Sequence, residues 1–462
     1  MRKLERRAAL CIVLALLLVA GMAFYVYRLA VNGATWVSYP ANQDVYTDGY
    51  LSKGGIYDRN GTMLLKHTKK GGTQYSSSYA TRVATMHAVG DKQGNISTGA
   101  NQVFSSRMVG YSFLNGTFST DNSGRRVYLS IDADLCRTAY NALDGHNGTI
   151  GVYNYKTGEI VCMVSSPSYD PLNPPTVSAD DSSGIYLNKL LSSRVVPGST
   201  FKVITSTAAL ETLSDNYLNN FTYTCTGTKR YGSLSMEKVT CPVPHGTVNF
   251  RQALAKSCNC AFATLTEKIG ADNLKKYVKK AGLMDSYDVD GVKTIKGSFS
   301  FPSSGLNLAW TGIGQYQDLV NPCSMMVYMG AIANGGKAAN PRILNSVKYK
   351  NGFSAGFQFK TKTDELINSD TADELADMMH NNVTSNYGSE NYPGLDLCAK
   401  SGTAQLSSGQ QPHSWFVGFL RNKDYPYAFI VLEEHGGWGS EVAGKAANTV
   451  LQKLISTDDL AD

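Results

Sequence analysis

The sequence of 462 residues has only one long apolar run, at its N-terminus, which excludes a protein that crosses a membrane several times. Charged residues are few, at 17% of the chain, while 42% of the residues are hydrophobic, which excludes an intrinsically disordered chain. The 44 glycines follow no period, so a collagen-like chain is excluded as well. The length allows roughly two to three domains of about 150 residues each.

Basic residues are not clustered in the body of the chain. The net charge is +6, of which +3 lies in the first seven residues, so the other 455 residues carry only +3. They contain no basic run, no internal repeat and no long low-complexity linker. The sequence therefore gives no electrostatic indication of nucleic-acid binding.

The nine cysteines show no zinc-binding spacing in the sequence. Cys258 and Cys260 are two positions apart and no second pair stands at zinc spacing with histidine, so the sequence predicts no metal site. Cys225 and Cys241 lie in a Gly/Thr-rich segment and could form a disulfide, which the sequence leaves open. The others lie in apolar surroundings and are predicted to be buried thiols.

The apolar run spans residues 8–27, and about 20 such residues are long enough to cross a bilayer core of about 30 Å. Basic residues precede it, which predicts a cytoplasmic N-terminus with the rest of the chain outside. The alternative is a cleaved signal peptide, whose apolar region is usually shorter and ends in small residues. Here the run ends in aromatic residues and Arg28, which favours an uncleaved single-pass anchor in the cell membrane.

Beyond the anchor, the patterning predicts a mixed α and β chain. Short strands are expected at 55–57 and 126–131, and a helix from Asp132, its N-cap, to Leu143. Around residue 148 the composition changes, and the next segments predict a hairpin. A second antiparallel pair is expected near the C-terminus. The hairpin pairs 149–153 with 159–164, and the late pair joins 414–420 to 427–432.

Ser199 and Lys202 form the first of three motifs. Pro197-Gly198 ends the preceding segment and an Ala-rich apolar helix follows, so Ser199 is expected at a helix N-terminus with Lys202 one turn along the same face. A serine hydroxyl needs a base to take its proton, and a lysine can serve when burial and a neighbouring cation lower its pKa. Alone, the motif is weak and more typical of an N-cap serine beside a solvated lysine.

The second motif is Ser257-Cys258-Asn259, 58 positions after Ser199 and again before an apolar helical run. A hydroxyl and an amide two positions apart in a non-helical turn can face the same way. They could then shuttle a proton and hold a substrate amide. Alone, this motif is also typical of an ordinary loop and helix cap.

The third motif, Lys400-Ser401-Gly402-Thr403, lies in a predicted strand over 397–404. A glycine inside a strand often marks the close approach of a ligand or of another backbone segment. Lys400 supplies a cation, and the hydroxyls of Ser401 and Thr403 can bind an anionic group.

Together the motifs S-x-x-K, S-x-N and K-S-G, in this order, are the signature of the serine acyltransferases that include penicillin-binding proteins and β-lactamases. The sequence resembles the class B penicillin-binding proteins, which are membrane-anchored transpeptidases of cell-wall synthesis. Other segments that carry the resemblance are 54–61, 129–132, 154–160, 165–171, 312–315, 321–322, 331–336 and 413–419. Lys53 in place of an arginine, a short pedestal and Ser401 in place of a threonine depart from the family.

The resemblance implies an α+β fold with a penicillin-binding/serine β-lactamase-like transpeptidase domain, in which helices flank an antiparallel sheet and form an all-helical subdomain. A small β-rich pedestal and one N-terminal transmembrane helix would precede it. The implied boundaries are 1–28 for the cytoplasmic tip and transmembrane anchor, 29–147 for the pedestal and 148–462 for the transpeptidase domain.

The resemblance also implies a mechanism on peptidoglycan stem peptides that end in D-Ala-D-Ala. Ser199 would attack the carbonyl between the two D-alanines while Lys202 accepts its proton. Ser257 would relay a proton to the leaving D-alanine, with Lys400 tuning the field. Asn259 would bind Lys202 and the donor amide. An acceptor amine would then resolve the acyl-enzyme.

Substrate binding is implied for the third motif, at Ser401, Gly402, Thr403 and Ala404. The hydroxyls of Ser401 and Thr403 would bind the terminal carboxylate, and the backbone N–H groups of Ser199 and Thr403 would form the oxyanion hole. β-Lactams would acylate the same serine. No metal or organic cofactor is implied. Because the pedestal is too short to hold a glycan-polymerising domain, a SEDS-type membrane glycosyltransferase is the expected partner.

Other functions share these motifs. A class A β-lactamase needs a glutamate that activates water, and Glu267, Glu365, Glu374 and Glu390 do not stand in such a context. The membrane anchor and pedestal fit a β-lactam sensor poorly. A D,D-carboxypeptidase has identical motifs, and a non-catalytic wall scaffold would be expected to have lost some of them.

Overall fold

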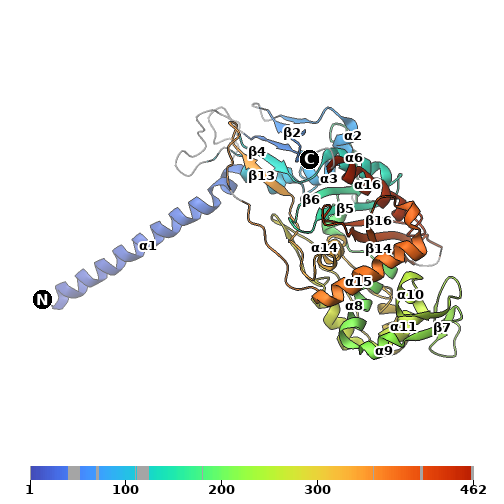
Figure 1. Ribbon diagram of the computed structural model, residues 1–462. Coiled ribbons are helices and arrows are strands. Elements are labelled where there is room, and N and C mark those ends of the chain that lie inside the picture. The colour runs from blue at the N-terminus through green and yellow to red at the C-terminus, as the bar shows by residue number, and fades with distance from the viewer. Residues whose placement is uncertain are drawn as a thin grey trace.

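The computed structural model describes residues 2–39, 53–68, 72–109, 111, 124–178, 180–356, 358–405 and 409–458. A single long helix, α1 (Arg2–Ser38), projects away from a body of sheets and helices (Figure 1). Its most apolar window has a mean hydropathy of 2.7 and is not buried at all. The helix meets the body near its end, beside α5 (Ser105–Met108), where Gly33 leaves room for the ring of Tyr111. The predicted apolar segment therefore lies in one largely exposed helix, which ends ten residues beyond residue 28, the expected end of the anchor.

A small sheet lies next to the end of α1, with the strand order β13-β4-β1-β2-β3. Its strands are β1 (Gly55–Tyr57), β2 (Met63–His67), β3 (Thr73–Tyr75), β4 (Arg126–Leu129) and β13 (Leu344–Lys348). Strands β1 and β4 are parallel, and the other neighbours are antiparallel. The strand predicted at 55–57 is confirmed, and the one predicted at 126–131 is present but ends at Leu129. Strand β13 comes from a segment more than 200 residues after β4, so the small sheet joins two distant parts of the chain.

Four short helices lie between β3 and β4 in the chain, and a longer helix leads from β4 to the main sheet. They are α2 (Tyr79–Ala84), α3 (Met86–Val89), α4 (Ala100–Val103), α5 and α6 (Ala133–Ala142). The predicted N-cap of α6 is confirmed, because the Asp132 carboxylate accepts hydrogen bonds from the backbone N–H groups of Asp134 and Leu135.

The main sheet has the order β14-β15-β16-β5-β6 and is antiparallel throughout. Its strands are β5 (Gly148–Asn154), β6 (Ile160–Ser166), β14 (Leu397–Ala404), β15 (His413–Leu420) and β16 (Tyr427–Glu433). Both predicted strand pairs are confirmed. Helix α6 packs with α16 (Ala443–Asp458) against the sheet, and α14 (Pro322–Ala333) packs against it with α15 (Ser369–Asn382). Because every residue of β16 is buried, the sheet is covered on both faces.

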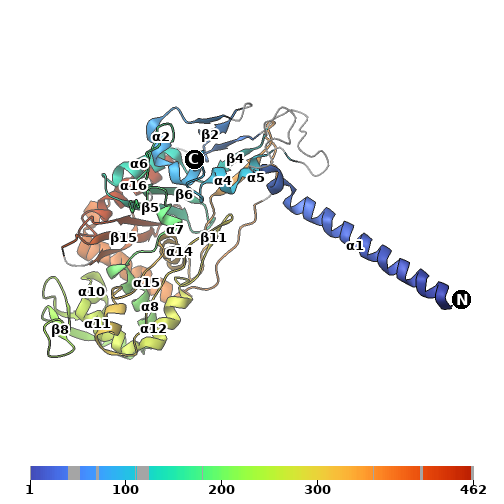
Figure 2. The ribbon, with the colours of Figure 1, turned by 180° about the vertical axis from the view of Figure 1, so that it is seen from behind.

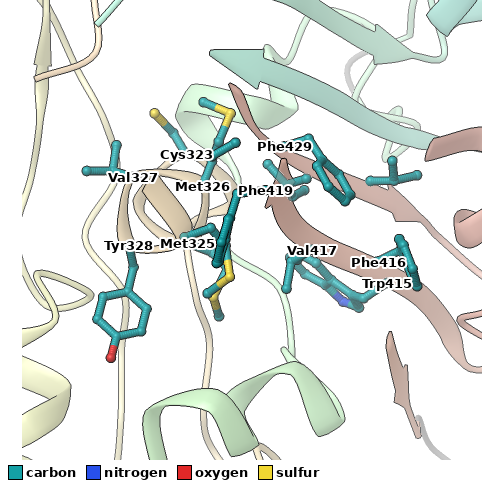
Figure 3. Packing of buried hydrophobic residues seen from close by; sticks show 14 of the residues in the cluster. Cys323, Met325, Met326, Val327, Tyr328, Trp415, Phe416, Val417, Phe419 and Phe429 are labelled. Atoms are coloured by element: carbon teal, nitrogen blue, oxygen red, sulfur yellow. The ribbon is translucent and has the colours of Figure 1, made fainter. Parts of the chain in front are cut away.

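Helix α14 is the apolar centre of the molecule. Its first eleven residues are all buried, as expected for a helix that is hydrophobic on every side. Asn321 caps it, and Pro322 stands at its first turn, where no backbone N–H is needed. Figure 3 shows Met325 and Met326 of α14 on the side of the helix that faces the aromatic residues of β15 and β16, and the sulfur of Met326 also lies close to Gly151 of β5.

The helices at the far end of the body form a subdomain around α8 (Figures 1 and 2). Its helices are α8 (Lys202–Thr212), α9 (Asp215–Asn219), α10 (Phe250–Ala255), α11 (Asn259–Ile269), α12 (Ala271–Lys280) and α13 (Gly305–Thr311). Two two-stranded sheets accompany these helices, so the expectation of an all-helical subdomain is wrong. They pair β7 (Thr222–Cys225) with β10 (Gly246–Asn249), and β8 (Thr228–Arg230) with β9 (Lys238–Thr240).

The remaining elements are short connections between these parts. They are α7 (Lys189–Ser192), η3 (Gly198–Phe201), β11 (Asp288–Val289), β12 (Val292–Lys293), the π-helical η4 (Val383–Tyr387) and η5 (Ser389–Asn391). The α+β architecture is confirmed. It has an antiparallel sheet between helices, a largely helical subdomain, and a small five-stranded sheet near one long N-terminal helix.

Candidate active site

Ser199 lies in η3, the single 3-10 turn that leads into α8. The turn begins at Gly198, which has a φ of +54°, a conformation that favours glycine. A Cβ atom at Gly198 would also lie 2.9 Å from the Cα of Ala404 in β14. The Gly198 N–H donates to the carbonyl of Gly314 at 2.9 Å. The expected position at a helix N-terminus is thus confirmed, and the turn is held between β14 and the segment that follows α13.

Lys202, at the start of α8, is completely buried. Its Nζ lies 2.8 Å from Ser199 Oγ, 2.7 Å from the carbonyl oxygen of Ser257 and 2.6 Å from Asn259 Oδ1. Burial lowers the pKa of Lys202 to about 8. A neutral amine has two N–H groups and one lone pair, and the two carbonyl oxygens can only accept. Both N–H groups are therefore engaged, and the lone pair is left for a hydroxyl proton. Two hydroxyls are within reach, Ser199 Oγ at 2.8 Å and Ser257 Oγ at 3.0 Å, and Ser199 is the nearer.

Ser257 joins two lysines. It has a φ of +54°, which is uncommon for a residue other than glycine, and this places its side chain at the junction between α10 and α11. Its Oγ lies 3.0 Å from Lys202 Nζ and 3.1 Å from Lys400 Nζ. Asn259 is held from the other side, because its Nδ2 donates to the carbonyl of Thr240 at 2.7 Å.

Lys400 is the second buried lysine of the site. Its Nζ donates to the carbonyl of Ser401 at 2.6 Å in addition to Ser257 Oγ. Burial, and then the charge of Lys202, lower the pKa of Lys400 well below its ordinary value. Ser199, Lys202, Ser257 and Lys400 therefore form one chain of contacts along which a proton can move.

The residues of β14 alternate between two environments. Ser401 and Thr403 line a cleft of about 580 Å³ that Ser199, Ser257 and Asn259 also line. Gly402 and Ala404 are buried behind them, against the turn that carries Ser199, where a Cβ atom at Gly402 would lie 3.0 Å from the carbonyl of Pro197. The six predicted catalytic residues come together at this cleft. Gly402 and Ala404 lie in the layer that supports it.

Tyr387, at the end of η4, is a site residue that the sequence reasoning missed. Its hydroxyl accepts the backbone N–H of Ser401 at 2.9 Å and lies 3.0 Å from Ser401 Oγ. The ring packs edge-on against Phe416 of β15 at 5.6 Å. Tyr387 stands 14 positions before Ser401 in no recognisable motif, so no signal in the sequence marked it.

We expect Tyr387→Phe to lower the free energy of unfolding by about 1–3 kcal/mol, because the buried N–H of Ser401 loses its partner. Calorimetry would measure this change. Tyr392→Phe is a matched control, since Tyr392 also stacks on Phe416 at 5.7 Å while its hydroxyl lies toward Gly444. Equal melting temperatures for the two variants would contradict the expectation.

The cysteines near the cleft differ from their sequence-based interpretation. Cys225 and Cys241 are free thiols with their sulfur atoms 3.7 Å apart, so the possible disulfide is not formed. The expectation of no metal site rested on Cys258 and Cys260. The fold instead brings Cys225, Cys241, Cys258 and His245 together, with their ligand atoms within 4.8 Å of one another. The other described cysteines except Cys11 are buried, as predicted.

Comparison with known proteins agrees with this geometry. Residues 148–455 match the family model of the penicillin binding protein transpeptidase domain. The chain belongs to this family. It is 27% identical to the peptidoglycan D,D-transpeptidase PbpA of Mycolicibacterium smegmatis over 94% of each chain. It is 29% identical to the stage V sporulation protein D of Bacillus subtilis over 73% of this chain and 54% of that protein.

Solved structures of penicillin-binding proteins share the fold. The imipenem acyl-enzyme of penicillin-binding protein A from M. tuberculosis aligns with a TM-score of 0.76 and 22% identity, over 88% of this chain and 98% of that one. The D,D-transpeptidase domain of a peptidoglycan glycosyltransferase from Eggerthella lenta aligns with a TM-score of 0.74 and 24% identity, over 89% and 99%. As a penicillin-binding protein, the chain brings a serine hydroxyl, a lysine amine and a second hydroxyl into contact, an arrangement suited to nucleophilic acyl transfer.

Proposed function

We propose that the chain is a peptidoglycan D,D-transpeptidase in which Ser199 forms the acyl-enzyme. The observation that carries this proposal is the set of contacts of Lys202, whose two carbonyl partners engage its N–H groups and whose nearest hydroxyl is that of Ser199. The D,D-transpeptidases among its relatives support the choice of reaction.

In the acylation step, Ser199 Oγ bonds to the carbonyl carbon between the two D-alanines, and its proton passes to Lys202. Ser257 gives its own proton to the leaving amine and is reprotonated from the lysines on either side. The C–N bond breaks and D-alanine leaves. Lys400 donates a hydrogen bond to Ser257 Oγ and so stabilises this oxygen while the proton is in transit.

The remaining contacts of the substrate follow from β14. The hydroxyls of Ser401 and Thr403 bind the terminal carboxylate. Gly402 and Ala404 are small, so the strand can lie close both to the substrate and to the turn that carries Ser199. The backbone N–H groups of Ser199 and Thr403 bind the oxyanion, each contributing roughly 3 kcal/mol to the transition state. Asn259 holds Lys202 and the donor amide. An amine from a neighbouring stem peptide then attacks the ester and completes the cross-link.

We also propose that α1 anchors the protein in the cell membrane with its N-terminus in the cytoplasm. The exposed apolar helix and the basic residues before it support this topology. A SEDS-type glycosyltransferase would supply the glycan strands and contact the anchor and the pedestal, residues 29–147. Failure to co-purify with any such polymerase would contradict this partner.

The test is the intact mass of the detergent-solubilised chain, followed over hours with benzylpenicillin. We expect a stable adduct of one whole drug molecule, because the β-lactam carbonyl acylates the same serine. Ser199→Ala is the control and should form no adduct.

Each other outcome points to a different function. A transient adduct with rapid hydrolysis of the drug would indicate a β-lactamase. If the adduct is stable, assays with a donor thioester separate transfer to an amine from hydrolysis, and exclusive hydrolysis would indicate a D,D-carboxypeptidase. No adduct and no thioester turnover would indicate a non-catalytic scaffold.

A further inference from the structure

Three thiols and one imidazole converge beside the catalytic cleft. Cys225 ends β7, Cys241 follows β9, His245 precedes β10 and Cys258 caps the N-terminus of α11. Their ligand atoms all lie within 4.8 Å of one another. The four residues therefore come from four separate segments, in the pattern C-x15-C-x3-H-x12-C, whose spacing does not resemble a compact zinc motif.

Three of the six distances between ligand atoms match a tetrahedral metal centre, and the other three are within 4.8 Å. Cys241 Sγ lies 3.7 Å from Cys225 Sγ and 3.8 Å from Cys258 Sγ, and Cys225 Sγ lies 3.6 Å from His245 Nδ1. Zinc binds sulfur at about 2.3 Å and nitrogen at about 2.0–2.1 Å, so tetrahedral ligands lie about 3.8 Å apart for two sulfurs and about 3.6 Å apart for sulfur and nitrogen. A disulfide needs about 2.05 Å between its sulfur atoms.

We propose that Cys225, Cys241, His245 and Cys258 bind one zinc ion as a structural Cys3His site. Four protein ligands would fill the tetrahedral shell and leave no position for substrate, which is typical of a structural zinc rather than a catalytic one. The soft thiolate ligands favour zinc over magnesium or calcium.

The local architecture explains what such an ion would stabilise. The sheets β7-β10 and β8-β9 have two strands each, and an isolated two-stranded sheet is marginally stable in water. The four ligands lie at the ends of these strands and at the start of α11. One ion would therefore join both small sheets to the helix that begins with Asn259.

The site would also position two residues of the proposed mechanism. Cys258 stands between Ser257 and Asn259, and Cys241 directly follows Thr240, whose carbonyl accepts the hydrogen bond from Asn259. Cys241 and His245 themselves line the cleft. Zinc would hold this wall of the cleft against the turn that carries Ser257 in its uncommon backbone conformation.

Metal content tests the proposal directly. We expect the full-length chain, purified in detergent without a polyhistidine tag, to contain one zinc per chain by plasma mass spectrometry. Cys225→Ser and His245→Gln should each reduce the zinc to background. Cys260→Ser is the matched control, because Cys260 Sγ also lies 3.6 Å from Cys241 Sγ but is outside the mutually close group, and it should retain the metal.

Two readouts on the unaltered chain remain useful even where a variant fails to fold. Cobalt exchanged for zinc should give the absorption bands of a tetrahedral thiolate complex. Removal of zinc by a chelator should lower the melting temperature and slow acylation by benzylpenicillin, and added zinc should restore both. Metal content and the cobalt spectrum do not depend on the proposed function, so the two proposals can fail separately.

Three results would overturn the zinc site. The first is a chain without stoichiometric zinc and without cobalt bands. The second is a non-reduced mass lower by two hydrogens, which would show a disulfide among these cysteines. The third is zinc retained at full occupancy in Cys225→Ser and His245→Gln, which would show adventitious metal elsewhere.

Discussion

Lys202→Met should slow acylation by benzylpenicillin about 10²–10⁴-fold, the usual contribution of a positioned general base. Methionine keeps most of the aliphatic volume of the buried lysine but cannot accept the proton of Ser199. Lys202→Arg should be similarly slow, because a guanidinium stays protonated throughout the accessible pH range. Rapid-mixing measurements of adduct formation would give the rates.

The control for this substitution is Lys275→Met, on the exposed side of α12 and not among the residues that line the cleft. It makes the same chemical change without touching the proposed machinery, so its acylation rate should match that of the unaltered chain. Acylation of Lys202→Met at an unchanged rate would show that another group accepts the proton.

The same lysine predicts the pH dependence of the reaction. Since burial lowers the pKa of Lys202 to about 8, the neutral and basic form is the minor one below that pH. The acylation rate should rise about tenfold per pH unit below pH 8 and level off above it. Lys400 and the thiols of Cys241, Cys258 and Cys260 are the titratable groups that face this amine. A flat profile in the unaltered chain would contradict the assignment.

Gly314→Ala should slow acylation about 100-fold or more, although Gly314 is not expected to touch the substrate. A Cβ atom there would overlap the carbonyl oxygen of Gly198 and lie 2.6 Å from the Cβ of Phe201. The turn that carries Ser199 would have to move, and a displacement of about 1 Å can cost about 100-fold in rate. Adduct formation followed by intact mass would measure the loss.

Gly352→Ala separates this displacement from simple backbone strain. Gly314 and Gly352 have φ angles of +75° and +90°, but a Cβ atom at Gly352 meets no atom within 4 Å. Each substitution should lower the free energy of unfolding by roughly 1–2 kcal/mol, because alanine is strained in a left-handed backbone conformation. Only Gly314→Ala should also lose acylation. Equal acylation rates in the two variants would show that the turn tolerates the contact.

The local features of this chain could be predicted from the sequence because they depend on neighbouring residues. The N-cap at Asp132 and the hairpin β5-β6 follow from capping chemistry and alternating patterns within a few positions. The exposed apolar helix follows from one apolar run. The turn that carries Ser199 follows from Pro197-Gly198, which ends the preceding segment. The three motifs identified the chemistry because their residue types and order are specific.

The tertiary structure decided which distant residues meet. The small sheet takes β13 from a segment more than 200 residues away, and Tyr387 reaches Ser401 through a π-helical turn that no pattern marked. Cys225 and His245 join Cys258 only because two small sheets fold against α11. Capping and periodicity act over one or two turns of chain, whereas these contacts depend on how buried side chains pack between elements. That packing is a property of the whole core, and no short stretch of sequence contains it.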